Sequence, residues 1–398
     1  MTCQICAGPT VPGLDLGHQP VSDLLLTRAD LGRPETHYPL QLHHCPGCGL
    51  TQLGYTVSPR VVYRHFPFVS GTTATATRHL HGLARELTER ARLGRGSFAL
   101  DIGSNDGTLL KGYQPSGVRV LGVDPAGAPV RIAERAGIET LHAFFDADTA
   151  EHIAVTHGEA DVISAAGVFA HVAELDGLMR GVKRLLAPGG IFATDSQYWL
   201  DMVERLHWDN IFHQHLRYYS MRPLLRLFDR YDMEVFDVTR SDVYGGSIRA
   251  FAGHRGAHPV AEGVAALGAF EEGQGLYAAA THQEFARKVA ERLRGLVQAV
   301  HALAADGRKV IGLGGPAKAS TVCNAGRLGP ELIAYITEVN PLRVGTYLPG
   351  VHVPIVAEDT MFSDPRPADA GILFAWNYAD EIVPKLRTRG FQGEVLRP

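Results

Sequence analysis

The sequence predicts an α/β protein with two Rossmann-like units behind a small N-terminal module held by a metal ion. Three observations support this fold class: apolar strands that alternate with helical stretches from residue 97 onward, a glycine-rich turn after a strand in each unit, and two Cys-x-x-Cys pairs near the N-terminus. Such alternation is typical of parallel sheets with right-handed crossovers. At 398 residues the chain is too long for one ordinary core, so we expect two or three domains.

The composition excludes several classes of protein. Hydrophobic residues make up 45% and charged residues 20% of the chain, a balance typical of a soluble globular protein. A net charge of −4 argues against the basic face that nucleic-acid binding requires. No apolar run approaches the roughly 20 residues of a membrane span, and the N-terminus lacks the apolar segment of a secretory signal. We therefore expect a cytoplasmic protein with no membrane and no nucleic-acid partner.

The first element is the cysteine-containing module, residues 1–60. Its cysteines form two matched pairs, Cys3 with Cys6 and Cys45 with Cys48, and a glycine follows each pair within two residues. A tight turn after such a pair points backbone N–H groups at the thiolates, and two pairs complete a tetrahedral zinc site. No ligand position remains for water, so the zinc is predicted to be structural. The alternative is two disulfides in a secreted module, which the missing signal disfavours.

The remaining elements follow in chain order. A helical pattern around residues 80–92 precedes four expected strands of the first unit, and an Ala-, Leu-, Glu- and Arg-rich stretch then predicts a helical connector. The second, shorter unit has three expected strands. The strands are predicted at 97–102, 118–123, 161–166 and 190–194, then at 309–313, 333–337 and 371–375. The predicted domains are 1–60, 61–255, 256–306 and 307–398.

The glycine-rich turn of the first unit predicts a cofactor site. Residues 101–107 read Asp-Ile-Gly-Ser-Asn-Asp-Gly, between a strand and a helix that starts at residue 108. Glycines let the backbone bend sharply and approach a ligand, and Asp124, at the end of the next strand, is placed to accept ribose hydroxyls. Only Gly103 and Gly107 are present, a spacing that fits S-adenosylmethionine (SAM) rather than the pyrophosphate of a dinucleotide. An ordinary turn with a surface aspartate is the alternative.

A second turn supports SAM. Residues 186–190, Leu-Ala-Pro-Gly-Gly, form a turn that is common before a late strand of class I methyltransferases. The first unit is therefore predicted to be a class I methyltransferase domain. The expected cofactor-binding residues are Asp101, Gly103, Ser104, Asn105, Gly107, Asp124, Pro125, Gly167 and Val168.

Together with the cysteine pairs and the SAM loop, several further strings make the chain resemble a specific family over essentially its whole length. This family comprises the bacterial sugar C-methyltransferases, which act on nucleotide-linked keto-deoxysugars and build the branched sugars of antibiotics. The resemblance implies SAM, structural zinc, a dTDP-type sugar as small-molecule substrate, and a monomer or homodimer. The strings lie at 167–172, 208–220, 245–249, 314–318, 347–350 and 375–382.

The resemblance also implies a mechanism. A C–H next to a ketone loses its proton, and the resulting enolate attacks the methyl group of SAM. Histidine is the natural base because its pKa is near neutral. The family's base corresponds to His215, and a second family histidine corresponds to His171, which would donate a hydrogen bond to the enolate oxygen. On an extended segment His213 would share the face of His215, so it is a further candidate.

Five positions depart from the family pattern. Gln214 replaces a glutamate, Phe212 and Phe68 replace tyrosines, Tyr244 replaces a histidine, and Gly167 replaces an asparagine. We expect a less polar pocket, in which Gln214 binds substrate but does not stabilise an imidazolium. Three consequences stay open: a substrate other than an amino-keto sugar, another group that completes the proton transfer, or a site that binds its ligands and catalyses poorly.

The glycine-rich turn of the second unit predicts an anion site. Residues 312–318 end in Lys318 and lie between a strand and a helix, so free N–H groups and a lysine would face an anion. The resemblance assigns this half to the nucleotide diphosphate of the sugar, with Arg343, Tyr347 and Asn377 as further candidates. The alternatives are a glycine-rich connector with a solvated lysine, and core packing of the string that contains Asn377.

Two other functions remain as hypotheses. One is a SAM-dependent methyltransferase with a divergent acceptor, methylated at carbon or oxygen, and the other is a non-catalytic protein that binds SAM and zinc. A zinc-knuckle nucleic-acid module is disfavoured by the acidic balance of the chain.

Overall fold

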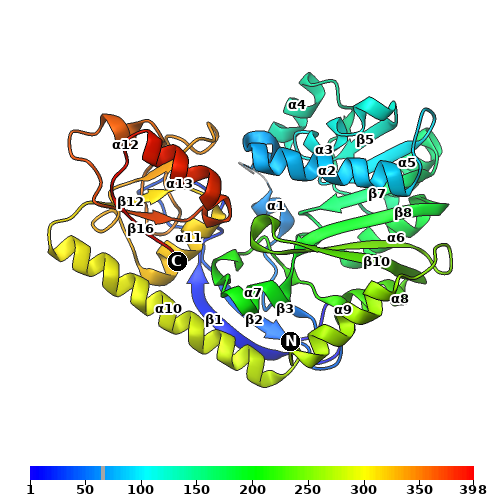
Figure 1. Cartoon of the computed structure of the whole chain (residues 1–398), viewed down its shortest axis with the longest axis horizontal. Helices are drawn as coiled ribbons and strands as arrows, with labels where there is room; N and C mark the ends of the chain where they lie inside the picture. Colours follow the sequence, from blue (N-terminus) through cyan, green and yellow to red (C-terminus); the bar gives the residue numbers. More distant parts are fainter. Residues whose placement is uncertain (64–67) are drawn as a thin grey trace.

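A computed structural model describes residues 1–63 and 68–398. In these residues the strands form sheets of four, seven and five strands. Figure 1 shows the seven-stranded sheet on the right and the five-stranded sheet on the left, with the N-terminal strands and a long helix below and between them. No helix in the described part of the chain is long and apolar enough to cross a membrane.

The N-terminal sheet is antiparallel, in the order β1-β2-β3-β9. No strand was predicted in this module, whereas β1 alone has nine residues. The last strand of this sheet comes from far along the chain, directly after His215, so the module supports the segment that carries this histidine. The strands are β1 (Val11–Gln19), β2 (Tyr38–His44), β3 (Thr51–Leu53) and β9 (Arg217–Tyr218).

The seven-stranded sheet has the order β10-β11-β8-β7-β4-β5-β6. Its interior strand β4 is buried at every position, as expected for a parallel strand covered on both faces. The chain moves outward from β4 to β5 and β6 and returns to β7 on the other side of β4. Ligands bind at the carboxyl ends of strands next to such a switch point. The strands are β4 (Phe98–Ile102), β5 (Arg119–Val123), β6 (Thr140–Leu141), β7 (Ala160–Ala166), β8 (Leu186–Gln197), β10 (Met233–Ser241) and β11 (Ser247–His254).

Two features of this sheet were not predicted. Strands β10 and β11 extend it as an antiparallel edge. The Leu-Ala-Pro-Gly-Gly segment at 186–190 is the start of β8 itself, beside a register irregularity with β7, rather than a turn before the strand. The helices around the sheet are α1 (Pro59–Val62), α2 (Ala74–Arg90), α3 (Thr108–Lys111), α4 (Gly127–Arg135), α5 (Ala147–His157), α6 (Leu175–Leu185), α7 (Trp199–Arg205) and α8 (Met221–Arg230).

Helices α9 (Glu262–Gly273) and α10 (Ala279–Ala305) connect the two larger units. Helix α10 buries Phe285, Val289 and Leu296, spaced four and seven residues apart, so one stripe of the helix faces the core. It contacts β1, α11 and β12 and runs beneath the five-stranded unit (Figure 1). This helix therefore fixes the C-terminal unit against the N-terminal sheet.

The C-terminal sheet is parallel, in the order β14-β13-β12-β15-β16. Three of its strands follow the predicted positions, although the second begins only at Ile336. The switch point lies between β12 and β15, so this unit also opens at the carboxyl ends of its strands. The elements are β12 (Val310–Leu313), α11 (Ala317–Gly326), β13 (Ile336–Glu338), β14 (Ile355–Ala357), α12 (Thr360–Ser363), β15 (Ala370–Leu373), α13 (Ala379–Thr388) and β16 (Glu394–Leu396).

Candidate active site

A cavity of about 780 Å³ is lined by the carboxyl ends of both parallel sheets. Its wall includes the loop after β4, the segment around His215, and the start of α11. The N-terminal module contributes Asp23 to the same wall. One cavity is therefore in contact with residues of all three sheet-containing units.

The loop after β4 has the backbone that its glycines require. Gly103 and Gly107 have φ of 69° and 74°, and Asn105 between them has φ of 52°. A Cβ at Gly103 would lie 2.6 Å from Val168, so only glycine fits there. The predicted cofactor residues that line the cavity are Asp101, Gly103, Ser104, Asn105, Asp124, Pro125, Gly167 and Val168; Gly107 does not line it and lies against Ile138.

Asp124 is held by the same loop. Its carboxylate accepts hydrogen bonds from the backbone N–H of Asn105 at 2.9 Å and of Ala126 at 2.7 Å. Burial raises the pKa of Asp124, and these two N–H groups oppose the rise. Each carboxylate oxygen keeps a lone pair for a ribose hydroxyl. The cradle around Gly103 and the oriented Asp124 therefore fit SAM.

Asp101 lies deeper in the same wall. It accepts a hydrogen bond of 2.6 Å from Ser164 Oγ, and burial raises its pKa to about 7. The segment before α2 closes over the loop, because Asn105 accepts from the backbone N–H of Ser70 at 2.9 Å and donates to the carbonyl of Phe68 at 3.1 Å. Phe68, a predicted substrate residue, thereby lines the cavity beside the cofactor loop.

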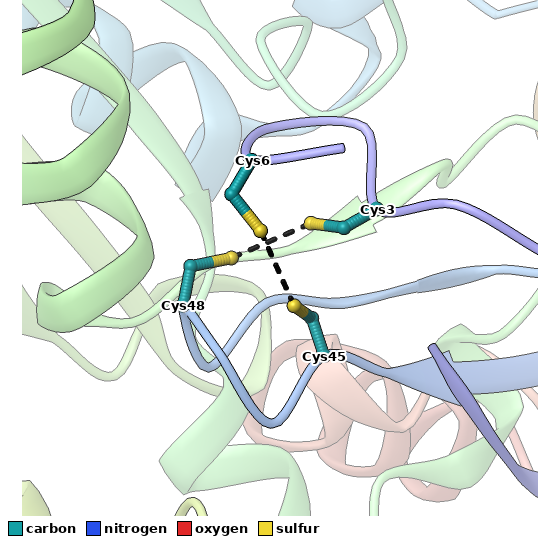
Figure 2. A group of neighbouring side chains, drawn as sticks. All are labelled: Cys3, Cys6, Cys45 and Cys48. Carbon is teal, nitrogen blue, oxygen red and sulfur yellow. Dashed lines mark hydrogen bonds between the residues drawn. The ribbon is translucent and has the colours of Figure 1, made fainter. Parts of the chain in front are cut away.

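The four predicted zinc ligands come together in the N-terminal module. Their sulfur atoms all lie within 4.8 Å of one another, and the side chains converge from two turns (Figure 2). The Sγ–Sγ distances are 3.4 Å for Cys3 with Cys48 and for Cys6 with Cys45, close to the separation of about 3.8 Å in a tetrahedral zinc–thiolate site. The backbone N–H of Ile5 points at Cys3 Sγ at 3.4 Å. All five cysteines are free, so the disulfide alternative is wrong and the donor set fits structural zinc.

Two histidines lie together in the cavity wall, of which His215 is buried and His171 half-buried. The rings of His171 and His215 are stacked with centroids 4.8 Å apart. His215 Nδ1 lies 2.6 Å from the carbonyl oxygen of Asn210, which can only accept, so Nδ1 carries the proton and Nε2 keeps its lone pair. Nε2 faces the side-chain amide of Gln197 at 3.4 Å. Burial lowers the pKa of His171 to about 4 and that of His215 well below its usual value, so both rings are neutral at pH 7.

His213 does not join this pair. The backbone N–H of His215 bonds the carbonyl of Phe212 in a turn, so the segment is not extended and alternate residues do not share a face. His213 Nε2 lies 3.3 Å from the carbonyl of Tyr38 in the N-terminal module, and His213 is not part of the cavity wall. The expectation that His213 shares the face of His215 is therefore wrong.

Three of the predicted substrate residues, Phe68, Phe212 and Tyr244, have aromatic rings in the cavity wall. Phe212 packs on His215 with ring centroids 3.8 Å apart, and Tyr244 lines the cavity with φ of 58°. Tyr347, in contrast, lies outside the cavity wall. Its backbone pairs with Leu26 and with Pro354, because the chain folds back onto the N-terminal module here. The structure therefore does not place Tyr347 at the site.

Lys318 faces the cavity at the start of α11. Its Nζ lies 3.2 Å from Asn377 Oδ1 and 3.8 Å from the centroid of the Trp376 ring. Burial lowers the pKa of Lys318 to about 8, and the negative charge of Asp209 opposes this. A buried cation with one neutral hydrogen-bond partner, next to a helix N-terminus, is suited to an anionic group.

Arg343 is already paired. Its guanidinium donates to Asp23 and, at 2.7 Å, to the carbonyl of Gly315. The other oxygen of Asp23 accepts from Gln214 Nε2 at 3.1 Å. Asp23, Arg343 and Gln214 are each at most 5% exposed, so a buried ion pair links the three units. The prediction for Arg343 therefore changes: its charge is neutralised by Asp23, and of the two predicted cations only Lys318 lacks an ion pair in the described part of the chain.

Asp23→Ala is expected to lower the free energy of unfolding by about 3–5 kcal/mol, because Arg343 would stay buried without its counter-charge. Urea denaturation followed by tryptophan fluorescence measures this. Asp30→Ala is the matched control, since Asp30 pairs with Arg33 on the surface and its removal should leave the unfolding midpoint unchanged. Equal midpoints for both variants would contradict the ion pair's role.

Sequence reasoning missed several residues of the wall. Asp195 and Gln197 lie at the carboxyl end of β8, a position that marks ligand contacts in parallel sheets and offered a usable signal. Asp23 and His79 lie in no recognisable motif and reach the cavity only through the tertiary fold. The polar residues of the cavity wall that were not predicted include Asp23, His79, Asp195, Gln197 and Asn210.

Three family profiles match successive parts of the chain: a zinc-binding domain at 3–63, a methyltransferase domain at 76–238, and a C-methyltransferase C-terminal domain at 242–396. C-methyltransferase NovU of Streptomyces niveus is 34% identical over 384 residues, which cover 96% of this chain and 91% of that protein. A ubiquinone biosynthesis O-methyltransferase of Escherichia coli is 28% identical over 124 residues, 29% of this chain and 52% of that protein. A SAM-dependent methyltransferase structure from Clostridium acetobutylicum covers 45% of this chain and 92% of its own, at 13% identity and a TM-score of 0.37.

Proposed function

We propose that the acceptor of this enzyme is a nucleotide-activated keto-deoxysugar. The chain belongs to the C-methyltransferase family that joins a zinc-binding domain, a methyltransferase domain and a C-terminal domain. It is a SAM-dependent methyltransferase with structural zinc. The proposed substrate is a dTDP-type sugar from a pathway of antibiotic or other specialised-metabolite biosynthesis. We assign cofactor binding to residues 61–255 and nucleotide binding to residues 307–398, on either side of the connector 256–306.

The observation that carries this proposal is the shared cavity. It brings the SAM loop, the neutral histidine pair and the cation Lys318 into one space. A nucleotide-linked sugar has its diphosphate at one end and its reacting carbon at the other. In this cavity the C-terminal unit contributes the cation Lys318, and the methyltransferase unit contributes the base His215 together with the cofactor loop. The diphosphate would bind at the first unit and the reacting carbon at the second.

His215 is the base in the proposed reaction. When bound, SAM supplies the electrophilic methyl group. The free Nε2 of His215 takes the proton from the carbon next to the ketone, and the bond from Nδ1 to the carbonyl of Asn210 fixes the tautomer that makes Nε2 available. The side-chain amide of Gln197, at 3.4 Å, gives way to the substrate C–H.

His171 stabilises the oxygen of the enolate. A ring N–H of His171 donates to the ketone oxygen as negative charge develops there, and Nε2 of His171 has no hydrogen-bond partner among the described residues. One such donor is worth roughly 3 kcal/mol in a water-excluded site. Neutral imidazole is suited to this because the low pKa of His171 keeps the ring from holding an ionic charge beforehand.

Lys318 and the N-terminus of α11 hold the diphosphate. Asn377 orients the ammonium group at 3.2 Å, and the Trp376 ring covers it. Phe212 and Phe68 supply apolar surface at the sugar end. This surface favours a deoxygenated sugar over one with a full set of hydroxyls.

The test is incubation with SAM and a panel of dTDP-linked 4-keto sugars, followed by mass spectrometry. We expect a product heavier by one methyl group, located on the carbon next to the ketone, and solvent deuterium exchange at that carbon without SAM. Methylation of an oxygen, or of an acceptor without a nucleotide, would overturn the proposed substrate. Absence of any transfer and exchange across the panel would reject the keto-sugar assignment.

A further inference from the structure

A third histidine faces the cavity from α2 and is not used by the mechanism above. Residues 195 and 197 lie on the same face of β8, about 7 Å apart along the strand. Gln197 contacts His215, and Asp195 contacts His79 Nε2 at 3.0 Å. Neighbouring same-face positions of one strand thus hold two different imidazoles against the same cavity.

Asp195 is a charged carboxylate. Its Oδ2 accepts from Arg249 Nε at 3.1 Å and Nη2 at 2.7 Å, and from His79. Burial by itself would raise the pKa of Asp195, but the hydrogen bond from His79 and the charge of Arg249 lower it below its usual value. His79 Nε2 lies 3.0 Å from this carboxylate, which can only accept, and 3.4 Å from Arg249 Nη2, which can only donate. The shorter contact places the ring proton on Nε2, so Nδ1 of the neutral ring has the lone pair.

The ion pair does not need the histidine. Arg249 already neutralises Asp195 and also binds Glu86 on α2 at 2.6 Å, so β8, β11 and α2 are joined without His79. His79 has an 8% exposed side chain that lines the cavity, edge-on to Tyr244 with centroids 5.6 Å apart. Among the described residues no group bonds to His79 Nδ1. This nitrogen is an oriented acceptor without a protein donor.

Asp195, which holds His79, is bonded to the wall of the cofactor site. The backbone N–H of Gly167, in the wall of the cofactor site, donates to the carbonyl of Asp195 at 2.7 Å. His79, Tyr244 and Ser247 line the same cavity as the cofactor loop. Gln197, two residues after Asp195 on the same face of β8, contacts His215 at 3.4 Å.

We propose that His79 is an acceptor-binding residue, whose Nδ1 accepts a hydrogen bond from a hydroxyl or amino substituent of the sugar. Asp195 and Arg249 are the positioning residues that fix its tautomer. This inference rests on the proposed function for the nature of the substrate. It adds the requirement that the sugar has a hydrogen-bond donor within reach of His79.

Two variants test the roles of the two ring nitrogens of His79 one at a time. In His79→Gln the amide reaches the position of Nε2 and keeps the bond to Asp195, but no acceptor remains at Nδ1. In His79→Asn the side-chain oxygen replaces Nδ1, and the contact with Asp195 is lost. By isothermal titration, His79→Gln is expected to weaken sugar-nucleotide binding about tenfold, as loss of one hydrogen bond allows, and His79→Asn to weaken it less.

The readouts distinguish this inference from the proposed function. SAM affinity should be unchanged in both variants, and a sugar nucleotide that lacks the donor substituent should bind wild type and His79→Gln equally. His301→Gln, on the exposed side of α10, is the matched control. Equal binding of the complete sugar to wild type and His79→Gln, or a loss confined to SAM, would overturn the role of His79. Failure of the wild-type protein to bind any sugar nucleotide would instead reject the proposed function.

Discussion

His215→Ala is expected to lower kcat for methyl transfer by about 10² to 10⁴, because general-base catalysis by one positioned side chain contributes that much. The free Nε2, the 2.6 Å bond from Nδ1 to Asn210, and burial in the cavity wall are the reasons. SAM affinity should not change, since His215 does not belong to the cofactor loop. Single-turnover kinetics with SAM and the accepted keto sugar measure the effect, and solvent deuterium exchange should fall in parallel.

His213→Ala is the matched control for this experiment. His213 is two residues away and points to Tyr38 in the N-terminal module, so its removal should leave kcat within about threefold of wild type. A large loss in His213→Ala with full activity in His215→Ala would reverse the assignment of the base. Full activity in both would show that another group takes the proton.

The pH dependence follows from the same geometry. A base acts when it is unprotonated, so kcat/KM rises with pH as His215 loses its proton. Burial and the neighbouring His171 lower the pKa of His215 well below 6.5, which moves this rise to acidic pH. Lys318, with a pKa of about 8, loses its charge as the pH rises further, and kcat/KM should fall there. In Lys318→Met the alkaline fall should be absent.

Removal of zinc is expected to unfold the N-terminal sheet and to abolish methyl transfer. Structural zinc contributes about 10–16 kcal/mol of binding free energy in small zinc domains, and this free energy is lost with the metal. The effect reaches the active site because β9, directly after His215, pairs with β3 of the module, and Asp23 from the module binds Gln214. Cys48→Ser should therefore lose zinc, expose residues 1–60 to protease, and lose activity.

Cys323→Ala provides the control, since this fifth cysteine is buried in α11 away from the zinc ligands. It should keep one zinc per chain, by inductively coupled plasma mass spectrometry, together with wild-type protease resistance. Unchanged melting and activity after zinc removal from the wild-type protein would contradict the structural role. Loss of zinc from Cys323→Ala would contradict the ligand set.

Much of the site was predictable because its signals are local. Glycine spacing in the loop after β4 and two-residue spacing in the cysteine pairs are set by backbone geometry over a few residues, so both features are recognisable in the chain itself. The cofactors and the methyltransferase class were predicted in this way and are confirmed, and the four cysteines predicted as zinc ligands lie together. The edge strands β10 and β11 were missed because alternating patterns in a hairpin are weaker than buried parallel strands.

The tertiary structure is most informative for the cavity residues that depart from the family pattern. Gln214 stands where the family pattern has a glutamate, and the sequence left open which group compensates. In the structure a carboxylate is present after all: Asp23, 191 residues away in the chain, accepts from Gln214 and neutralises Arg343. Such a contact has no sequence signal, because its partners are joined only when the three units pack together.

The sequence by itself determined the zinc ligands, the cofactor loop and the α/β class, since each depends on residue type at short spacing. The fold alone decided which polar groups share the cavity. A turn at Phe212 separated His213 from His215, and backbone pairing with Leu26 and Pro354 kept Tyr347 away from the site. The end of β8 brought Asp195 into the cavity wall, where it holds His79 of α2. These outcomes depend on side-chain direction and on long-range packing, which local spacing does not encode.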